Sequence, residues 1–177
     1  METADEFAGE ADGYERLWTP HRMVYINSDH GDHECPFCRA PKRSDEEGLV
    51  VYRGQTCFVV MNLFPYNPGH LLVCPYRHVA GYVDLTEEER REFGELTASA
   101  MRVAEAALGA HGFNTGMNQG AVAGAGVAAH LHQHVVPRWQ GDANFFPIVA
   151  QTKAVPALIE NTRQQLVAAW KEAADAR

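Results

Sequence analysis

The chain has 177 residues, 46% of them hydrophobic and 21% charged, which is the composition of a globular domain with a sizeable core. Its formal net charge of -8 argues against a broad nucleic-acid-binding surface, and no apolar run approaches the roughly 20 residues that span a bilayer. The acidic N-terminus is unlike a secretory signal. We therefore expect a cytoplasmic protein with no nucleic-acid or membrane partner, made of a disordered acidic tail over residues 1–13 and a single domain over residues 14–177.

The first predicted elements are three β-strands. Two β-rich runs, 49–53 and 56–62, are separated by Gly54 and Gln55 and are expected to form a hairpin. A turn-rich loop follows, and residues 70–75 are then predicted to form a short, nearly continuous apolar strand.

A long helix is predicted next. Thr86 suits the N-cap and Glu89 suits its capping-box partner three residues later, and apolar residues then recur at helical spacing until Gly109. Strands are expected over residues 113–118 and 127–136, the second of which ends at a proline.

A closing helix is expected to begin at Pro156, since proline suits the first turn of a helix. Its apolar face consists of five residues: Leu158, Ile159, Leu166, Val167 and Trp170. Together these elements predict an α+β domain with about five strands and two main helices.

Three histidines alternate on the last predicted strand. Residues two apart on a strand point to the same side, so His130, His132 and His134 are expected to line one face. Buried imidazoles need hydrogen-bonding partners, which makes three in a row a costly way to fill a core. A neutral imidazole is also a competent nucleophile near pH 7. The row therefore indicates a catalytic site.

The segment before the row is rich in glycine. Gly120, Gly124 and Gly126 would let backbone N–H groups approach phosphate oxygens closely, and Asn118 and Gln119 could add side-chain donors. A flexible connection between strands explains the glycines equally well when they are taken alone. Phosphorus is a suitable electrophile for a histidine, so the loop and the histidine row together favour a phosphate-bearing substrate.

Four cysteines fall into two groups. Cys35 and Cys38 are spaced as Cys-x-x-Cys, which in a cytosolic protein indicates metal or redox chemistry more often than a disulfide. Cys57 and Cys74 lie inside apolar runs and are expected to be inert core residues.

The segment 118–138 resembles the signature of the histidine triad family, in which three histidines alternate with residues that are usually apolar. Upstream, residues 58–62 and 67–75 are similar to the family's nucleotide-binding half, so the resemblance covers residues 35–145. It implies an antiparallel sheet and a homodimer in which two sheets are joined. Three more segments resemble the actinobacterial diadenosine polyphosphate phosphorylases of this family: 17–23, 44–50 and 134–145.

The resemblance implies a role for each site residue. His132 matches the nucleophile that attacks the α-phosphorus and holds the nucleotidyl group, and His134 matches the donor to the α-phosphate or bridging oxygen. Asn62 matches a residue that hydrogen-bonds the ribose hydroxyls. Asn118 or Gln119 matches a phosphate contact, in a loop one residue longer than is usual.

Two positions depart from the family pattern. Many members carry Gln or Ser where this chain has Gly126, so backbone N–H groups of the loop around Gly124 and Gly126 would have to replace that donor. The acceptor of the nucleotidyl group, phosphate or water, is therefore left open. Gln133 replaces an apolar residue, but it is expected to face away from the row, so the assignment of His132 stands.

In the zinc-bearing branch of the family, the Cys-x-x-Cys pair binds a structural ion together with two histidines. The resemblance implies four zinc ligands here: Cys35, Cys38, His78 and His130. Two alternatives stay open, in which His30 or His33 supplies a ligand, or in which His130 and His132 chelate the same ion. A site with four protein ligands has no open position, so the zinc would stabilise the fold without taking part in the chemistry.

The resemblance implies one of three functions. The main expectation is a nucleotidyl transferase that converts diadenosine tetraphosphate and phosphate into ATP and ADP. The second is a hydrolase that releases AMP from dinucleoside polyphosphates or nucleoside phosphoramidates through the same intermediate. The third is a zinc-stabilised nucleotide-binding module with little turnover, which the intact His132 disfavours. Lys153 and Arg163 could also contact phosphate, although solvated surface charges are the favoured interpretation.

Overall fold

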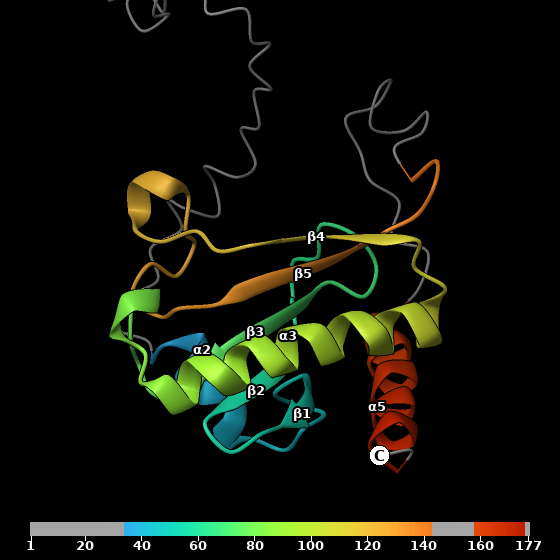
Figure 1. Ribbon diagram of the computed structural model, residues 1–177, viewed down its shortest axis with the longest axis horizontal. Coiled ribbons are helices and arrows are strands. Elements are labelled where there is room, and N and C mark those ends of the chain that lie inside the picture. Colours follow the sequence, from blue (N-terminus) through green and yellow to red (C-terminus); the bar gives the residue numbers. More distant parts are fainter. Residues whose placement is uncertain (1–33, 143–157, 176–177) are drawn as a thin grey trace, which may run out of the picture. The chain divides into compact units, whose positions relative to one another are not determined.

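The computed structural model describes residues 34–142 and 158–175 (Figure 1). Outside these ranges lie the predicted tail and four single residues that the sequence singled out: His30, His33, Lys153 and Pro156. The division of the chain into a tail over 1–13 and one domain over 14–177 therefore stays a prediction.

A five-stranded antiparallel sheet forms the centre of the structure, with the strand order β1-β2-β3-β5-β4 (Figure 1). Its strands are β1 (Val50–Arg53), β2 (Cys57–Met61), β3 (Leu71–Pro75), β4 (Gly112–Gly116) and β5 (Gln133–Arg138). β1 and β2 form the predicted hairpin, and β5 lies between β3 and β4 although it comes last in sequence among the described strands. The predicted α+β fold with about five antiparallel strands is confirmed.

The last strand begins later than predicted. We expected a strand over residues 127–136, but residues 127–130 form turns and β5 begins only at Gln133. The Leu131 N–H donates to the Val79 carbonyl at 2.6 Å, so a loop holds this segment where a neighbouring strand was expected.

This difference affects the histidine row. His130 and His132 lie on the approach to the sheet, and only His134 lies on a strand. Leu131, which was expected to point away from the row, is buried in the same apolar cluster as Val135, so its side chain faces away from the histidines as expected. The strand predicted over residues 127–132 is therefore wrong, and loop contacts hold His130 and His132, although the His132 ring still lies against the His134 ring.

Pro137 lies inside β5 and does not end it. β3 pairs with β5 only as far as Val135, whereas β4 pairs with it up to Arg138. Among the described strands, none pairs with the β3 side of β5 beyond Val135, so the missing N–H of Pro137 costs no ladder hydrogen bond there. Asn67 covers that side by donating to the Pro137 carbonyl at 3.0 Å.

Two long helices pack on one face of the sheet (Figure 1). α3 (Glu87–Leu108) begins at the predicted capping box of Thr86 and Glu89 and ends at Gly109, whose φ of 62° is a conformation that glycine adopts without strain. α5 (Ile159–Asp175) packs against α3 and β1. The remaining described elements are short: α2 (Pro36–Arg39), η2 (Ala40–Lys42), η3 (Tyr82–Asp84) and η4 (Ala121–Ala123).

The apolar face of α5 is confirmed except at its start. Leu166 and Trp170 are buried, and Ile159 and Val167 pack against the same core. Leu158 precedes the helix and is 73% exposed, so its inclusion in that face was wrong. Among the described helices, none combines the length and the hydrophobicity that crossing a membrane requires.

The sheet separates two apolar clusters. On β2, Cys57 and Val59 belong to the larger cluster beneath α3 and α5, whereas Phe58 belongs to the smaller cluster on the opposite face. The same alternation on β5 places Val135 in the larger cluster and directs His134 to the opposite face. The face of the sheet that the long helices leave uncovered therefore carries the candidate chemistry.

Glu89 joins the start of α3 to the loop after β3. Its buried carboxylate accepts hydrogen bonds from Arg77 at 2.9 and 2.6 Å and from the Thr86 N–H at 2.8 Å. The Arg77 guanidinium and, after it, the Thr86 N–H lower the pKa of Glu89 from 4.5 to about 2. Because the folded-state pKa is depressed, ionised Glu89 stabilises the fold above pH 4.5, and this contribution is lost as the pH falls toward 2.

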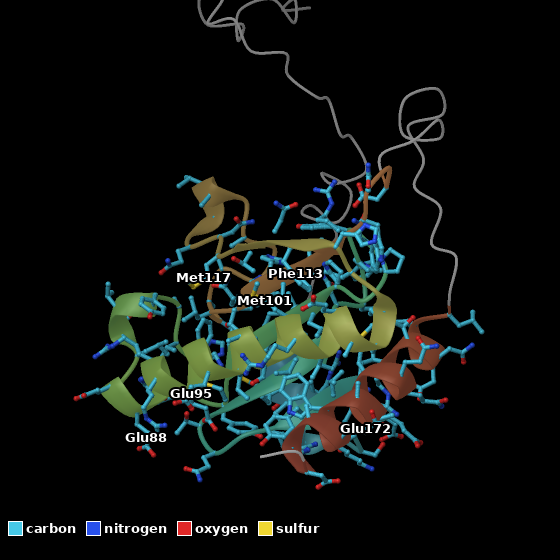
Figure 2. The ribbon with its side chains drawn as sticks, turned by 45° about the vertical axis from the view of Figure 1, so that its right-hand side comes forward. Glu88, Glu95, Met101, Phe113, Met117 and Glu172 are labelled. Carbon is cyan, nitrogen blue, oxygen red and sulfur yellow. The ribbon has the colours of Figure 1, made fainter. Side chains whose placement is uncertain are left out.

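We expect Glu89→Gln to lower the free energy of unfolding by about 1–3 kcal/mol at pH 7, because the charged hydrogen bonds with Arg77 are lost, whereas glutamine can still complete the capping box. The deficit should narrow as the pH falls below 4.5, where the wild-type protein loses the same contribution. Urea denaturation over this pH range measures both effects. Glu88→Gln, at an exposed neighbouring position (Figure 2), should change the free energy by less than about 0.5 kcal/mol. Equal losses in the two variants would contradict the assignment.

Candidate functional site

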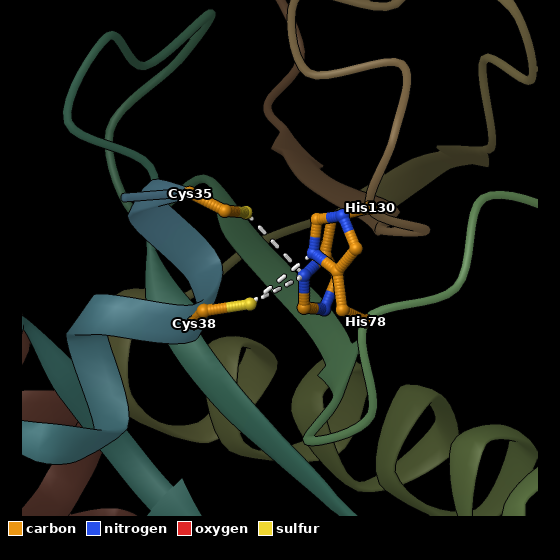
Figure 3. A group of neighbouring side chains, drawn as sticks. All are labelled: Cys35, Cys38, His78 and His130. Carbon is orange, nitrogen blue, oxygen red and sulfur yellow. Dashed lines mark hydrogen bonds between the residues drawn. The ribbon is translucent and has the colours of Figure 1, made fainter. Parts of the chain in front are cut away.

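The four predicted metal ligands come together beside the sheet (Figure 3). Their ligand atoms all lie within 4.8 Å of one another: Cys35 at the N-cap of α2, Cys38 on α2, His78 after β3, and His130 before β5. The Cys38 Sγ atom lies 3.2 Å from His78 Nδ1 and 3.5 Å from His130 Nδ1. The Cys35 Sγ atom lies 3.4 Å from His130 Nδ1. Two sulfur and two nitrogen donors at this spacing could hold one metal ion in tetrahedral coordination.

The local sequence explains how these ligands are presented. Pro36 starts a single helical turn in which the Cys38 N–H bonds to the Cys35 carbonyl, so the two thiols lie on the same side of the turn. His130 Nε2 donates to the Pro75 carbonyl at 2.9 Å. This bond leaves the lone pair on Nδ1, the atom that faces the thiols.

The alternative in which His130 and His132 chelate one ion is wrong. In the part of the chain that the structure describes, the group of potential ligands includes His130 but not His132. The His132 Nδ1 atom lies 2.9 Å from the His130 carbonyl oxygen and donates to it, so this nitrogen has no lone pair for a metal.

The other two cysteines are the inert core residues that their sequence context predicted. Cys57 and Cys74 are fully buried. Burial raises the pKa of the Cys57 thiol to about 11 and raises that of Cys74 well above its usual range. Both therefore stay protonated near neutral pH and are poor ligands and nucleophiles.

His132 is the buried centre of the histidine row. Because a carbonyl oxygen can only accept, its hydrogen bond to His130 places the His132 proton on Nδ1 and the lone pair on Nε2. Burial lowers the pKa of His132 below its ordinary value, and the hydrogen bond opposes this only in part. The imidazole is therefore neutral near pH 7, with Nε2 as its nucleophilic atom.

His134 is linked to a fourth histidine that the sequence analysis did not select. The Tyr66 N–H donates to His70 Nδ1 at 3.1 Å, so a neutral His70 carries its proton on Nε2. That Nε2 atom lies 2.9 Å from His134 Nδ1 and donates to it, which puts the proton of a neutral His134 on its own Nε2. The His132 and His134 ring centroids are 5.0 Å apart, so the ring with an Nε2 lone pair is next to the ring with an Nε2–H donor.

Strand register explains why His70 reaches this site. β3 pairs Leu72 with His134, and His70 precedes Leu72 by two residues on the same face. In the sequence, His70 was the first residue of an apolar strand and part of the segment 67–75 that resembles the family's nucleotide-binding half, with no role of its own. The signal that could have identified it was chemical, because a histidine directly before an apolar run needs a buried partner.

Asn62, the predicted ribose ligand, lies beside the histidine pair. Its Nδ2 atom is 3.2 Å from His70 Nδ1, and its Oδ1 atom accepts from the Phe64 N–H at 3.0 Å. The structure therefore brings Asn62 to His70, the partner of His134, and its contact with ribose stays a prediction.

The predicted phosphate loop is held by its own contacts and by η3. Asn118 Nδ2 donates to the Gly124 carbonyl at 3.4 Å, and the Gln119 amide oxygen accepts from the Tyr82 N–H at 2.8 Å. Gly124 has a φ of 79°, a conformation that other residues rarely adopt, and Gly126 is exposed. Gln119 thus anchors the loop, and the phosphate contacts of these residues stay predictions.

Arg163 is neither a phosphate ligand nor a solvated charge. Its side chain is buried, donates to the Val50 carbonyl at 3.1 Å and pairs with Glu160 at 2.9 Å. Both interpretations of this residue were wrong, because the Arg163 guanidinium is buried and hydrogen-bonded to a carbonyl group of the edge strand β1.

The fold and the site define a class of α+β proteins in which an antiparallel sheet presents paired histidines and a thiolate–imidazole cluster. A family model described as the HIT domain matches residues 43–141 of this chain. The chain therefore belongs to the HIT, or histidine triad, family, as its motifs implied.

Comparison with known proteins separates two kinds of relative. An AP-4-A phosphorylase from Mycobacterium tuberculosis is 47% identical over 175 residues, which cover 94% of this chain and 89% of the relative. A bis(5'-nucleosyl)-tetraphosphatase (asymmetrical) from Schizosaccharomyces pombe is 36% identical over 93 residues, which cover 52% of this chain and 50% of the relative. Similarity to the phosphorylase thus extends well beyond the HIT domain.

Among solved structures, a Zn-bound histidine triad family protein from Mycobacterium smegmatis has the same fold. It matches with a TM-score of 0.66 and 26% sequence identity, and the match covers 83% of this chain and 100% of that one.

Proposed function

We propose that this protein is an enzyme that transfers an adenylyl group from diadenosine tetraphosphate to inorganic phosphate, producing ATP and ADP through a covalent intermediate on His132. The observation that carries the proposal is the presence of two complementary groups in neighbouring rings. His132 has a lone pair on Nε2, His134 has a proton on Nε2, and the ring centroids are 5.0 Å apart. The phosphorylase relative, 47% identical over 94% of this chain, supports the choice of substrate.

In the first half-reaction, His132 Nε2 forms a P–N bond to the α-phosphorus while the P–O bond to the bridging oxygen breaks. ATP leaves with that oxygen. His134 Nε2–H donates to the α-phosphate or the bridging oxygen and stabilises the negative charge that develops there. His70 keeps the His134 proton on Nε2 by donating to Nδ1 of the same ring.

In the second half-reaction, an oxygen of inorganic phosphate forms a P–O bond to the adenylyl phosphorus while the P–N bond breaks. ADP is released, and the electron pair of the broken bond returns to His132 Nε2. Water in place of phosphate would give AMP, so the acceptor alone distinguishes a phosphorylase from a hydrolase.

We assign the ribose hydroxyls to Asn62, which lies beside the catalytic histidines. We assign the polyphosphate to the glycine-rich loop: Asn118, Gln119 and the backbone N–H groups at Gly124 and Gly126. The left-handed backbone at Gly124, with a φ of 79°, supports this assignment, because such turns direct successive N–H groups to one side.

We propose that the cysteine–histidine cluster holds a structural zinc ion. Two thiolates and two imidazoles are the donor set of closed zinc sites, and the Zn-bound relative from Mycobacterium smegmatis shares the fold. Bound zinc would cross-link α2 to the segments after β3 and before β5. Four protein donors leave no position for substrate, so the steps above belong to the histidines.

We also propose a cytoplasmic homodimer formed along β4. In the described part of the sheet β4 is an edge strand that pairs only with β5. Phe113 on β4, Met117 after it and Met101 on α3 are only partly buried (Figure 2). A second copy would cover these side chains and continue the sheet. Light scattering after gel filtration tests this, and a monomer at micromolar concentration would contradict it.

Product analysis tests the reaction. The protein is incubated with diadenosine tetraphosphate, with and without inorganic phosphate, and the nucleotides are separated by chromatography. The proposal predicts sustained formation of ATP and ADP in equal amounts only when phosphate is present. Sustained formation of AMP and ATP without phosphate would identify a hydrolase, and no turnover in either condition would identify a binding module.

His70→Ala is expected to lower kcat about 10–100-fold with little change in KM, because His134 loses the donor that keeps its proton on Nε2. Steady-state kinetics with saturating phosphate measure the two constants separately. An unchanged kcat would remove His70 from the mechanism.

A further inference from the structure

One aromatic side chain lies between the four predicted metal ligands, called the metal cluster below, and the catalytic histidines. Phe37 occupies the middle of the Cys-x-x-Cys turn on α2. Its ring centroid is 4.9 Å from that of His132, with the planes tilted by 40°. The same ring meets His130 edge-on, with centroids 5.5 Å apart and planes at 68°. These separations are those of aromatic rings in contact.

Phe37 is held in place from two directions. Its backbone lies between the thiol ligands Cys35 and Cys38. Its side chain packs against the smaller apolar cluster, on the face of the sheet opposite α3: Val50, Phe58, Val60, Leu72 and Cys74. Because the backbone is held in the turn and the side chain is packed against the cluster, the ring has little freedom to turn away from His132.

The contacts that orient His132 come largely from residues of the metal cluster. Its Nδ1 atom donates to the carbonyl of His130, itself a ligand, at 2.9 Å. One hydrogen bond lets an imidazole swing about the bonded atom. A ring packed against the imidazole opposes that swing, and Phe37 supplies this contact. Together with the His134 ring, whose centroid is 5.0 Å from that of His132, these two contacts set the direction of Nε2.

We propose that Phe37 is a positioning residue for the nucleophile: its ring holds the His132 imidazole so that Nε2 faces the α-phosphorus, and it thereby links the metal cluster to catalysis. This inference rests on the proposed function, in which His132 is the nucleophile. A displacement of about 1 Å in a reacting group can cost about 100-fold in rate. The Cys-x-x-Cys turn therefore has a second role besides supplying two ligands.

Phe37→Leu tests this role in the full-length, metal-loaded protein, because it removes the ring and keeps most of the apolar volume. We expect kcat to fall about 10–100-fold, KM to stay within about twofold, and metal content and Tm to remain close to wild type. Phe37→Tyr keeps the ring and should restore kcat to within about threefold of wild type. Tyr76→Leu is the matched control, since Tyr76 stacks on Phe58 of the same cluster at 5.1 Å and should leave kcat unchanged.

A second measurement does not depend on turnover. The 15N resonances of the His132 ring report which nitrogen carries the proton. Wild type and Phe37→Tyr should show the single Nδ1–H form that the bond to His130 requires. Phe37→Leu should show exchange between the two tautomers, because the ring can then leave that bond.

Three results would overturn the proposal. The first is a Phe37→Leu variant with unchanged kcat and an unchanged tautomer. The second is a rise in KM at constant kcat, which would assign Phe37 to substrate binding. The third is a loss of kcat in proportion to a loss of metal, which would confine Phe37 to the cluster. If His132→Ala kept full activity, the proposed function would fail, and the 15N spectra would still decide whether Phe37 orients His132.

Discussion

Replacing His132 with alanine is expected to lower kcat by a factor of at least about 10³, because the covalent step needs the lone pair on His132 Nε2. The same variant should fail to form the intermediate. Without inorganic phosphate, wild-type protein incubated with diadenosine tetraphosphate should gain one adenylyl group per active site, stable in alkali and labile in acid. Intact-protein mass spectrometry detects that group, and peptide mapping should place it on His132.

The effect must be separated from a loss of folding, since His132 is buried and its removal leaves a cavity. Tm and metal content measured on the same sample make this separation. His111→Ala is the matched control, because His111 is exposed and its imidazole accepts a loop hydrogen bond from the Gln140 N–H at 3.0 Å. Its kcat should stay within about twofold of wild type. Full activity or an adenylyl group on another residue in His132→Ala would refute the mechanism.

Local chemistry was predictable where a few neighbouring residues decide the backbone. The capping box of Thr86 and Glu89 and the left-handed Gly109 give α3 its bounds, and all three were identified in the sequence. The strand runs over 49–53 and 56–62 became β1 and β2, because alternate side chains on β2 enter the two apolar clusters.

The start of β5 was not predictable, since alternating histidines imitate the period of a strand. In place of a strand ladder, the Leu131 N–H donates to the carbonyl of Val79, a residue 52 positions earlier in the sequence. The role of His70 depends likewise on the pairing of Leu72 with His134 across two strands. Such register is a property of the assembled sheet, and a single sequence does not specify it.

The metal cluster was predictable in part, because two of its residues are neighbours in the sequence and the other two are distant. The spacing of Cys35 and Cys38 directly predicted metal or redox chemistry at this pair. His78 is 40 residues from its partner Cys38, and His130 is 92 residues from the same cysteine, so only the family resemblance could join them. The structure then brings all four within 4.8 Å, although the strand expected to carry His130 does not extend to it.

Cys38→Ser is expected to empty the metal cluster and to lower the free energy of unfolding by about 3–5 kcal/mol. The Cys38 Sγ atom lies close to both imidazoles, 3.2 Å from His78 Nδ1 and 3.5 Å from His130 Nδ1, so its loss affects the whole site. A metal that binds the folded state and not the unfolded chain adds its binding free energy to stability. For a chain of this length the deficit corresponds to a fall in Tm of about 10 °C.

Elemental analysis after gel filtration and thermal unfolding with and without added zinc measure the two effects. Cys57→Ala is the matched control: it removes a buried thiol from the larger core, should cost about 1–2 kcal/mol through packing, and should keep the metal. A Cys38→Ser variant with wild-type metal content would contradict the ligand assignment. Its kcat, measured well below its Tm, should also fall, because His130 supplies both a ligand nitrogen and the carbonyl that holds the His132 nucleophile at 2.9 Å. A cluster that only stabilised the fold would leave kcat unchanged at that temperature.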